Sequence, residues 1–149
     1  MLYLPAEDFF EEYVNYVKGE KASEDLTSFF KTQVDVLLID DIQFFAKRKG
    51  SSDKFFTIFS EMIRSGKQVV IASDKAPTEL QGLEQRLITR FTAGLTVNIK
   101  TPDIETSKQI LRTKITMLGL DINNIDSEVI DFYAEKFSSS VRDLEGALN

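Results

Sequence analysis

Two neighbouring carboxylates, Asp40 and Asp41, are the side chains of this sequence best placed to do chemistry. They directly follow the apolar run 36–39, and a short continuous apolar run is typical of a strand buried on both faces of a parallel sheet. Ligands bind at the carboxyl ends of such strands, where a carboxylate pair can hold Mg²⁺ and orient a water molecule. The alternative is a core strand whose aspartates simply begin the next loop.

Composition narrows the chemistry that is available. The chain has 149 residues, of which 42% are apolar, and this predicts one globular unit. It contains no cysteine and no histidine, so any catalysis would use carboxylates, hydroxyls, lysine and arginine. The net charge of -6 argues against a domain coated in nucleic acid but allows a local basic patch. With no signal peptide and no apolar stretch near the roughly 20 residues that cross a bilayer, we expect a cytoplasmic protein without a membrane-spanning segment.

Strand and helix patterns alternate over the first 100 residues, which indicates an α/β fold with a parallel sheet and flanking helices. The expected strands are 1–4, 34–39, 68–72 and 95–99, and the expected helices are 5–17, 23–30, 53–65, 83–91, 104–118, 127–137 and 141–148. Pro102 ends the last strand and Asp103 can cap a new helix. We therefore expect an α/β layer over 1–100 and an all-helical layer over 101–149.

Further charged and polar residues could meet a phosphate. Ser73 and Asp74 end the strand expected beside the Asp40 strand, although Asp74 could be only a turn cap. Arg86 and Arg90 lie four residues apart on one helix face, and Arg142 begins the last helix. Such arginines usually form a solvated face, but a phosphate-transfer site needs planar, permanently charged groups to stabilise negative charge.

The order of these pieces resembles the AAA+ domain family of the bacterial replication initiator DnaA over nearly the whole chain. The segments that carry the resemblance are 37–44, 71–77, 86–91, 94–95, 102–106 and the closing Arg-Asp-Leu-Glu-Gly-Ala-Leu at 142–148. The resemblance implies a partial P-loop NTPase sheet over 1–100 and part of a helical lid over 101–149. It also implies a parent protein that binds ATP and Mg²⁺, hydrolyses ATP slowly, assembles head to tail on origin DNA and melts it.

The resemblance also implies a role for each candidate residue. In a Walker B motif, Asp40 would bind Mg²⁺ and Asp41 would act on the hydrolytic water. Asp74, with Ser73, would be sensor I. The remaining roles fall to arginines: Arg90 would be the arginine finger, Arg86 would lie nearby in the intersubunit contact, and Arg142 would be the sensor II arginine of the lid.

The densest positive charge lies in the segment 44–52, which joins the Asp40 strand to the next expected helix. The family resemblance implies that this segment contacts the single strand of melted origin DNA, and the alternative is a solvated basic turn. Family members commonly have arginine where Gly50 stands. Phosphate contacts would give no sequence specificity. The candidate DNA-binding residues are Lys47, Arg48, Lys49 and Ser51.

The sequence departs from the family pattern because it contains no Gly-x-x-x-x-Gly-Lys-[Ser/Thr] phosphate loop. We therefore expect a fragment that holds no ATP or Mg²⁺ by itself, and whose segment 95–99 lacks a pairing neighbour. One alternative is a related AAA+ regulator or loader without a DNA-binding domain. A receiver-like signalling domain, with Asp74 and Lys100 in its key positions, leaves Arg90 and Arg142 unexplained.

Overall fold

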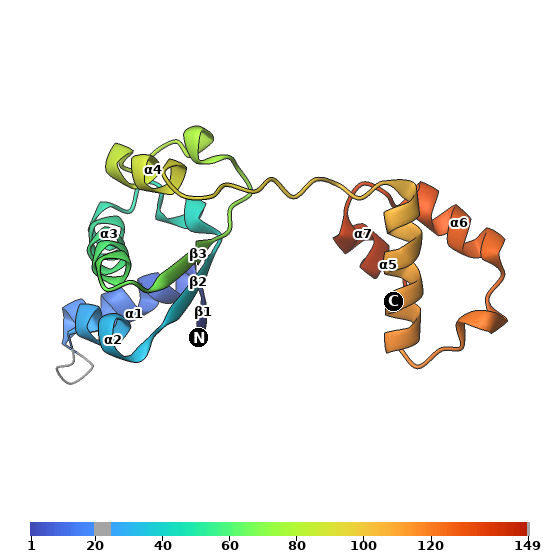
Figure 1. Cartoon of the computed structure of the whole chain (residues 1–149), viewed down its shortest axis with the longest axis horizontal. Coiled ribbons are helices and arrows are strands. Elements are labelled where there is room, and N and C mark those ends of the chain that lie inside the picture. The colour runs from blue at the N-terminus through green and yellow to red at the C-terminus, as the bar shows by residue number, and fades with distance from the viewer. Residues whose placement is uncertain (20–24, 149) are drawn as a thin grey trace. The chain divides into compact units, whose positions relative to one another are not determined.

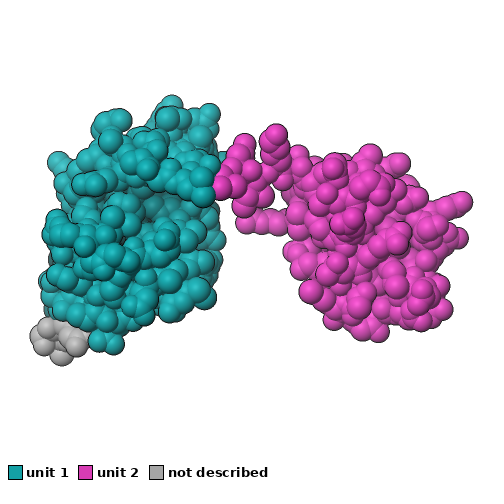
Figure 2. Space-filling model, viewed as in Figure 1, with its two compact units in different colours: residues 1–96 teal, residues 97–149 magenta. Residues whose placement is uncertain are grey.

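The computed structural model describes residues 1–19 and 25–148. The chain packs as two compact units, Met1–Thr96 and Val97–Asn149 (Figure 2). The division predicted from the sequence lies between residues 100 and 101. Each unit buries apolar side chains in a hydrophobic core of its own.

The first unit is built on a parallel sheet (Figure 1). In its described residues the strands are β1 (Leu2–Pro5), β2 (Val36–Asp40) and β3 (Gln68–Ile71), in the order β1-β2-β3. Two helices, α1 (Ala6–Lys18) and α2 (Leu26–Gln33), join β1 to β2, and α3 (Lys49–Arg64) joins β2 to β3. Right-handed crossovers that advance in one direction across a sheet place their helices on the same face. The parallel sheet and the helices that join its strands confirm the α/β class expected from the sequence.

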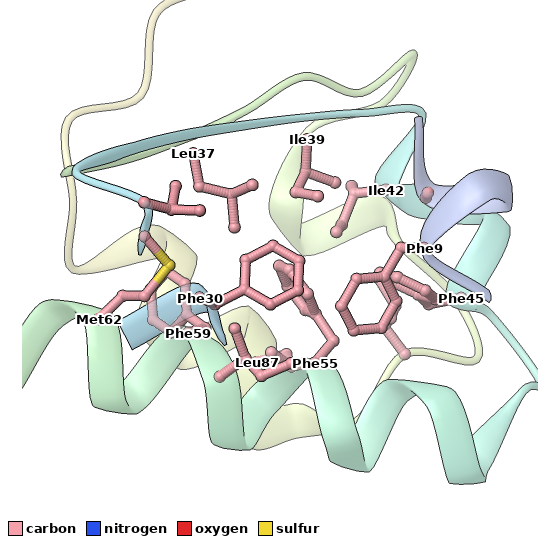
Figure 3. Packing of buried hydrophobic residues seen from close by; sticks show 14 of the residues in the cluster. Phe9, Phe30, Leu37, Ile39, Ile42, Phe45, Phe55, Phe59, Met62 and Leu87 are labelled. Carbon is pink, nitrogen blue, oxygen red and sulfur yellow. The ribbon is translucent and has the colours of Figure 1, made fainter. Parts of the chain in front are cut away.

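The core of the first unit lies between the sheet and these helices (Figure 3). Leu37 and Ile39 of β2 point toward a cluster of aromatic rings from the helices. Phe9 of α1 packs edge to face on Phe45 and on Phe55 of α3, with ring centroids 5.3 and 5.5 Å apart. Such pairs add to the free energy that burial alone supplies. This packing fixes β2, and with it the aspartates at its end.

The opposite face of the sheet is not covered within the described unit, and here the sequence prediction was wrong. Tyr3, Leu38 and Val70 lie side by side in register on that face. Tyr3 and Val70 are 57% and 46% exposed. The run 36–39 is continuously apolar, yet only its alternate residues Leu37 and Ile39 are fully buried. An apolar run thus predicted the strand correctly but not the number of covered faces.

The strand expected at 95–99 is also absent from the described structure. Leu95, Val97 and Ile99 are 92%, 71% and 92% exposed on an extended segment. The alternation of apolar and polar residues is typical of a strand, but a strand also needs a partner for its backbone hydrogen bonds. No described strand pairs with this segment.

Helix boundaries in the first unit differ from expectation, most of all at the start of α3. A short 3₁₀ helix, η1 (Ile42–Phe45), follows β2, and α3 begins at Lys49 rather than at residue 53. The segment 44–52 is therefore mostly helical. The N-cap of α2 is Asp25, whose side chain accepts from the backbone N–H of Thr27 at 3.2 Å. The cap expected at Ser23 lies outside the described residues. Past β3 come η2 (Pro77–Glu79) and α4 (Gln85–Thr92).

The second unit is helical throughout its described residues. It contains α5 (Ile104–Met117), η3 (Ile122–Asn124), α6 (Ser127–Lys136) and α7 (Val141–Gly146). Asp103 caps α5 by accepting from the N–H of Thr106 at 2.7 Å. The buried core is Leu111, Ile130, Ala134 and Leu144.

Some residues expected in apolar stripes of the second unit lie at its surface. Leu118, Val129 and Val141 are 56%, 45% and 38% exposed, because helical spacing marks a wider stripe than these short helices bury. None of the helices in the described parts of the chain combines the length and the apolar character that a membrane crossing demands.

Candidate functional site

The acidic pair lies at the carboxyl edge of the sheet. Asp40 is the last residue of β2, and Asp41 turns the chain into η1. Asp41 does so with a φ of 53°, in the left-handed region that is uncommon for residues other than glycine. A residue held there costs about 1 to 3 kcal/mol and persists only where its surroundings fix it. Its carbonyl accepts from the N–H of Phe44 at 2.9 Å.

Both carboxylate oxygens of Asp40 have partners. Oδ1 accepts from the backbone N–H of Asp41 at 2.9 Å, and Oδ2 accepts from the hydroxyl of Tyr3 on β1 at 3.0 Å. This hydrogen bond, more than partial desolvation and the neighbouring negative charges, raises the pKa of Tyr3 above its ordinary value. Tyr3 therefore holds the carboxylate from the adjacent strand, a contact that sequence reasoning missed.

The second strand end lies beside the first. The N–H of Ala72 donates to the carbonyl of Ile39 at 2.8 Å, and the N–H of Ile42 donates to the carbonyl of Ala72 at 3.2 Å. These bonds bring Ser73 and Asp74 to the edge that carries Asp40 and Asp41. Parallel strands are expected to end together in this way.

A side-chain bridge joins the two strand ends. Gln43 of η1 donates through Nε2 to Oδ1 of Asp41 at 2.8 Å, and the Ser73 hydroxyl donates to Gln43 Oε1 at 3.3 Å. Ser73 Oγ also accepts from the N–H of Lys75 at 3.2 Å. Asp74 is exposed and makes no hydrogen bond or ion pair within the described residues. Sequence reasoning named Asp41, Ser73 and Asp74 but assigned nothing to Gln43.

The two arginines of α4 have different surroundings. Arg86 pairs with Asp53 of α3 and with Glu84, and its guanidinium carbon lies 4.3 Å from the centroid of the Phe56 ring. Arg86 thus ties α4 to α3. Arg90, one turn later, is exposed and has no ion pair or hydrogen-bond partner in the described parts of the chain. Of these two arginines, only Arg90 presents an unpaired cation to solvent.

Arg142 belongs to the second unit. It follows Val141 at the start of α7, whose N-cap Ser140 accepts from the N–H of Asp143 at 3.1 Å. The Arg142 side chain is exposed and unpaired among the described residues of its unit.

The basic segment spans the end of η1 and the first turn of α3. Lys47, Arg48 and Lys49 are exposed. The Arg48 guanidinium carbon lies 3.8 Å from the centroid of the Phe44 ring, a cation–π contact. Ser51 differs from expectation because it is only 2% exposed and its hydroxyl donates to the carbonyl of Arg48 at 3.0 Å. That hydroxyl is buried in the helix start, so DNA cannot reach it in this conformation.

The donor set at the sheet edge can take part in a magnesium site but cannot complete one. Among the described residues no group of three or more carboxylates, histidines or cysteines could hold a metal ion. Asp40 and Asp41 offer hard oxygen ligands, and Mg²⁺ is usually held by one or two carboxylates with water and substrate phosphates filling its shell. The residues present therefore fit Mg²⁺ that arrives with a phosphate ligand.

A parallel α/β sheet that ends in an acidic pair, beside a second polar strand end and ahead of a helical unit in the sequence, is the arrangement expected of the AAA+ class of ATPase domains. The family model of the bacterial DnaA ATPase domain matches residues 1–98. The chain belongs to this family.

Individual relatives agree with this assignment. The chain is 42% identical over 149 residues to the chromosomal replication initiator protein DnaA of Francisella tularensis subsp. novicida, and 40% identical over 148 residues to that of Lactobacillus helveticus. These matches cover 100% and 99% of the chain but 29% and 31% of the relatives. The chain thus spans less than a third of the length of the curated relatives it matches.

Solved structures show the same fold. Domain III of the Thermotoga maritima replication initiation protein DnaA matches with a TM-score of 0.90 and 36% identity, over 98% of this chain and 59% of that one. The AMPPCP-bound DnaA of Aquifex aeolicus matches with a TM-score of 0.86 and 33% identity, over 99% of this chain and 44% of that one. A DnaA bound to AMPPCP and single-stranded DNA matches with a TM-score of 0.85 and 33% identity, over the same shares of the two chains.

Proposed function

We propose that this chain is the Walker B, sensor and lid portion of an ATP-controlled replication initiator, which assembles on origin DNA and opens it. The observation that carries the proposal is the gathering of Asp40, Asp41, Ser73 and Asp74 at one sheet edge. Residues 1–96 would serve as part of the AAA+ α/β subdomain and residues 97–149 as part of its helical lid.

In this proposal the residues of the sheet edge divide the work of ATP hydrolysis. Asp40 would hold Mg²⁺, which supplies charge neutralisation for the phosphates when it is bound with ATP. Asp41 would orient the attacking water and accept its proton. Ser73 and Asp74 would contact the terminal phosphate or that water. ATP hydrolysis would be slow, and it would control how long the ATP-dependent assembly persists.

The arginines would act between and within subunits. Arg90, which is exposed and has no partner in the described residues, would suit a finger that reaches the ATP of a neighbouring subunit. Arg86 would lie near the same intersubunit contact and would position α4 through its contacts with α3. Arg142 would read the bound nucleotide from the lid. Because a finger that enters the next subunit makes a heterologous contact, the assembly would be an open, head-to-tail filament.

The basic segment would contact the phosphates of single-stranded DNA. Lys47 and Lys49 are exposed, and their side-chain ammonium groups have no hydrogen-bond or ion-pair partner in the described residues, while Arg48 is held over Phe44. Binding of this kind is electrostatic and insensitive to sequence. A regulator or loader of the same family, without a DNA-binding domain, would share the ATP site. Origin-specific DNA binding by the complete protein would distinguish an initiator from such a regulator or loader.

Titration calorimetry with ATP and Mg²⁺ tests the nucleotide part of the proposal. The comparison is between this chain and the same chain extended upstream to include a phosphate loop. We expect heat of binding only from the extended chain, and hydrolysis by that chain should fall when Asp41→Asn removes the water-orienting carboxylate. Binding by neither chain would favour an interaction module that uses no nucleotide. Binding by this chain alone would overturn the family assignment of the site.

A charge reversal tests the DNA part. In the complete protein, Lys47→Glu with Lys49→Glu should weaken single-stranded DNA binding and lower the salt dependence of log K by about 0.7 for each phosphate that the protein no longer neutralises. The matched control is Lys100→Glu with Arg112→Glu, which changes the charge equally at other exposed positions. Fluorescence anisotropy at several salt concentrations measures both the affinity and its salt dependence. An equal loss of affinity in the two double variants would show that the effect comes from the net charge and not from Lys47 and Lys49.

A further inference from the structure

We propose that Gln43 is a positioning residue for ATP hydrolysis: its side-chain amide fixes the carboxylate of Asp41 and couples it to Ser73 at the end of the neighbouring strand. The inference rests on the proposed function, since it takes Asp41 as the group that orients the water. The proposed function itself assigns no role to Gln43.

The chemistry of the contacts fixes which way the amide points. An ionised carboxylate can only accept hydrogen bonds, so the NH₂ end of Gln43 must face Asp41. The carbonyl end is then left to accept from the Ser73 hydroxyl, and the two contacts measure 2.8 and 3.3 Å. Ser73 in turn accepts from the N–H of Lys75. Each group in this chain of hydrogen bonds donates to the next in one consistent direction.

The backbone holds the bridge in place from both sides. Ile42 and Phe45, which flank the bridging part of η1, are fully buried. The N–H of Ile42 bonds to Ala72, and the carbonyl of Asp41 accepts from Phe44. A reactive group is best oriented by a residue whose own position is fixed by packing. η1 is such a support, although it is only one turn long.

No other common side chain reproduces both bonds. Glutamate has the same shape but cannot donate to Asp41, and it would place a second negative charge against it. Asparagine is one methylene shorter. The bridge also links two strand ends, so a displacement of Ser73 by a bound phosphate would be passed through the amide to Asp41. Gln43 thus joins the residue that senses the phosphate to the residue that orients the water.

The test is Gln43→Glu in the complete protein, with ATP affinity and single-turnover hydrolysis measured separately. Misplacing a reacting group slightly can cost up to about 100-fold in rate, so we expect hydrolysis to slow by about 10- to 100-fold, with the Kd for ATP changed less than about 3-fold. Gln43→Met, of similar length and without an amide, should give a similar loss. The matched control Gln81→Glu makes the same chemical change at an exposed glutamine of the first unit and should hydrolyse normally.

A double-mutant cycle separates positioning through Asp41 from general damage. In an Asp41→Asn background, Gln43→Glu should cause no further loss, because the group it positions has lost its carboxylate. Wild-type hydrolysis in Gln43→Glu, losses that add in the double variant, or a parallel fall in ATP affinity would each overturn the inference. Failure of Asp41→Asn to slow hydrolysis would instead overturn the proposed function, and this inference with it.

Discussion

Tyr3 meets the acidic pair from the neighbouring strand through its hydrogen bond to Asp40 at 3.0 Å. A metal ion at Asp40 would have to share that carboxylate with the phenol or displace it. Tyr3 lies on the uncovered face of the sheet, so the hydrogen bond can adjust without disturbing the core. At the scale of single residues, the site combines the Asp40 carboxylate, which is held by two donors, with an Asp74 side chain that has no partner in the described residues.

The raised pKa of Tyr3 gives a testable pH dependence. Because the hydrogen bond to Asp40 makes the pKa higher in the folded state than in the unfolded state, the stabilisation is fully present below the ordinary value of about 10 and is lost as pH rises through the higher folded-state pKa. Tyr3→Phe should therefore be less stable than the parent chain at neutral pH, and the difference should shrink in strong alkali. Urea denaturation of both chains across this range measures it, and a difference that stays constant with pH would contradict the assignment.

Sequence patterns placed Asp40, Asp41, Ser73 and Asp74 correctly at strand ends, because parallel strands end at one edge. They did not find Tyr3 or Gln43. The partner of Tyr3 depends on the register between β1 and β2, and that of Gln43 depends on the left-handed turn at Asp41. Neither contact can be predicted from the local periodicity of the sequence. A polar side chain two residues after an acidic pair was the only signal that could have pointed to Gln43.

At the scale of elements, tertiary packing decided the boundaries that sequence patterns missed. The helical spacing of apolar residues predicted a start of α3 near residue 53, after Gly50, and glycine lowers helix propensity. In the structure Gly50 lies inside the first turn of α3, where a Cβ atom would stand 3.0 Å from the Tyr13 hydroxyl. Close packing on α1 thus favours a glycine that local propensity would count against a helix. Any residue with a Cβ atom at this position would require the Tyr13 hydroxyl to give way by a few tenths of an ångström.

Each unit has a core that can be tested by itself. Leu111 of α5 is 1% exposed in the core of the second unit, so Leu111→Ala should lower the free energy of unfolding there by about 2 to 5 kcal/mol. Val129→Ala, at an exposed apolar position, should cost about 0.5 kcal/mol or less. Hydrogen exchange followed by mass spectrometry resolves the peptides of each unit. Faster exchange confined to peptides of the first unit would contradict the assignment of Leu111 to a separate second core.

At the scale of the whole molecule, the chain joins an α/β unit to a helical unit and presents Arg90 on the surface of the first. If this arginine completes the site of a neighbouring subunit, it contributes nothing to ATP binding by its own subunit. Arg86, one helical turn earlier, is held by Asp53 and Glu84. Within the described residues, the two arginines therefore offer a contrast between an unpaired and an ion-paired side chain on the same helix.

Arg90→Ala in the complete protein should leave ATP affinity unchanged and abolish ATP-dependent assembly, since the cation that bridges subunits would be missing. Light scattering or electron microscopy with and without ATP gives the readout. Arg86→Ala serves as the comparison: it should loosen α4 and lower the melting temperature, which Arg90→Ala should not. ATP-dependent filaments that still form in Arg90→Ala would contradict the assignment of Arg90 as the arginine finger.

The exposed segment 95–99 bears on the lifetime of the chain. Its apolar side chains alternate along an extended backbone that has no hydrogen-bonded partner in the described structure. Molecular chaperones and proteases recognise stretches of this kind because unfolded polypeptides display them. The persistence of this chain should therefore depend on whether this segment finds a strand with which to pair, in addition to the stability of the two cores.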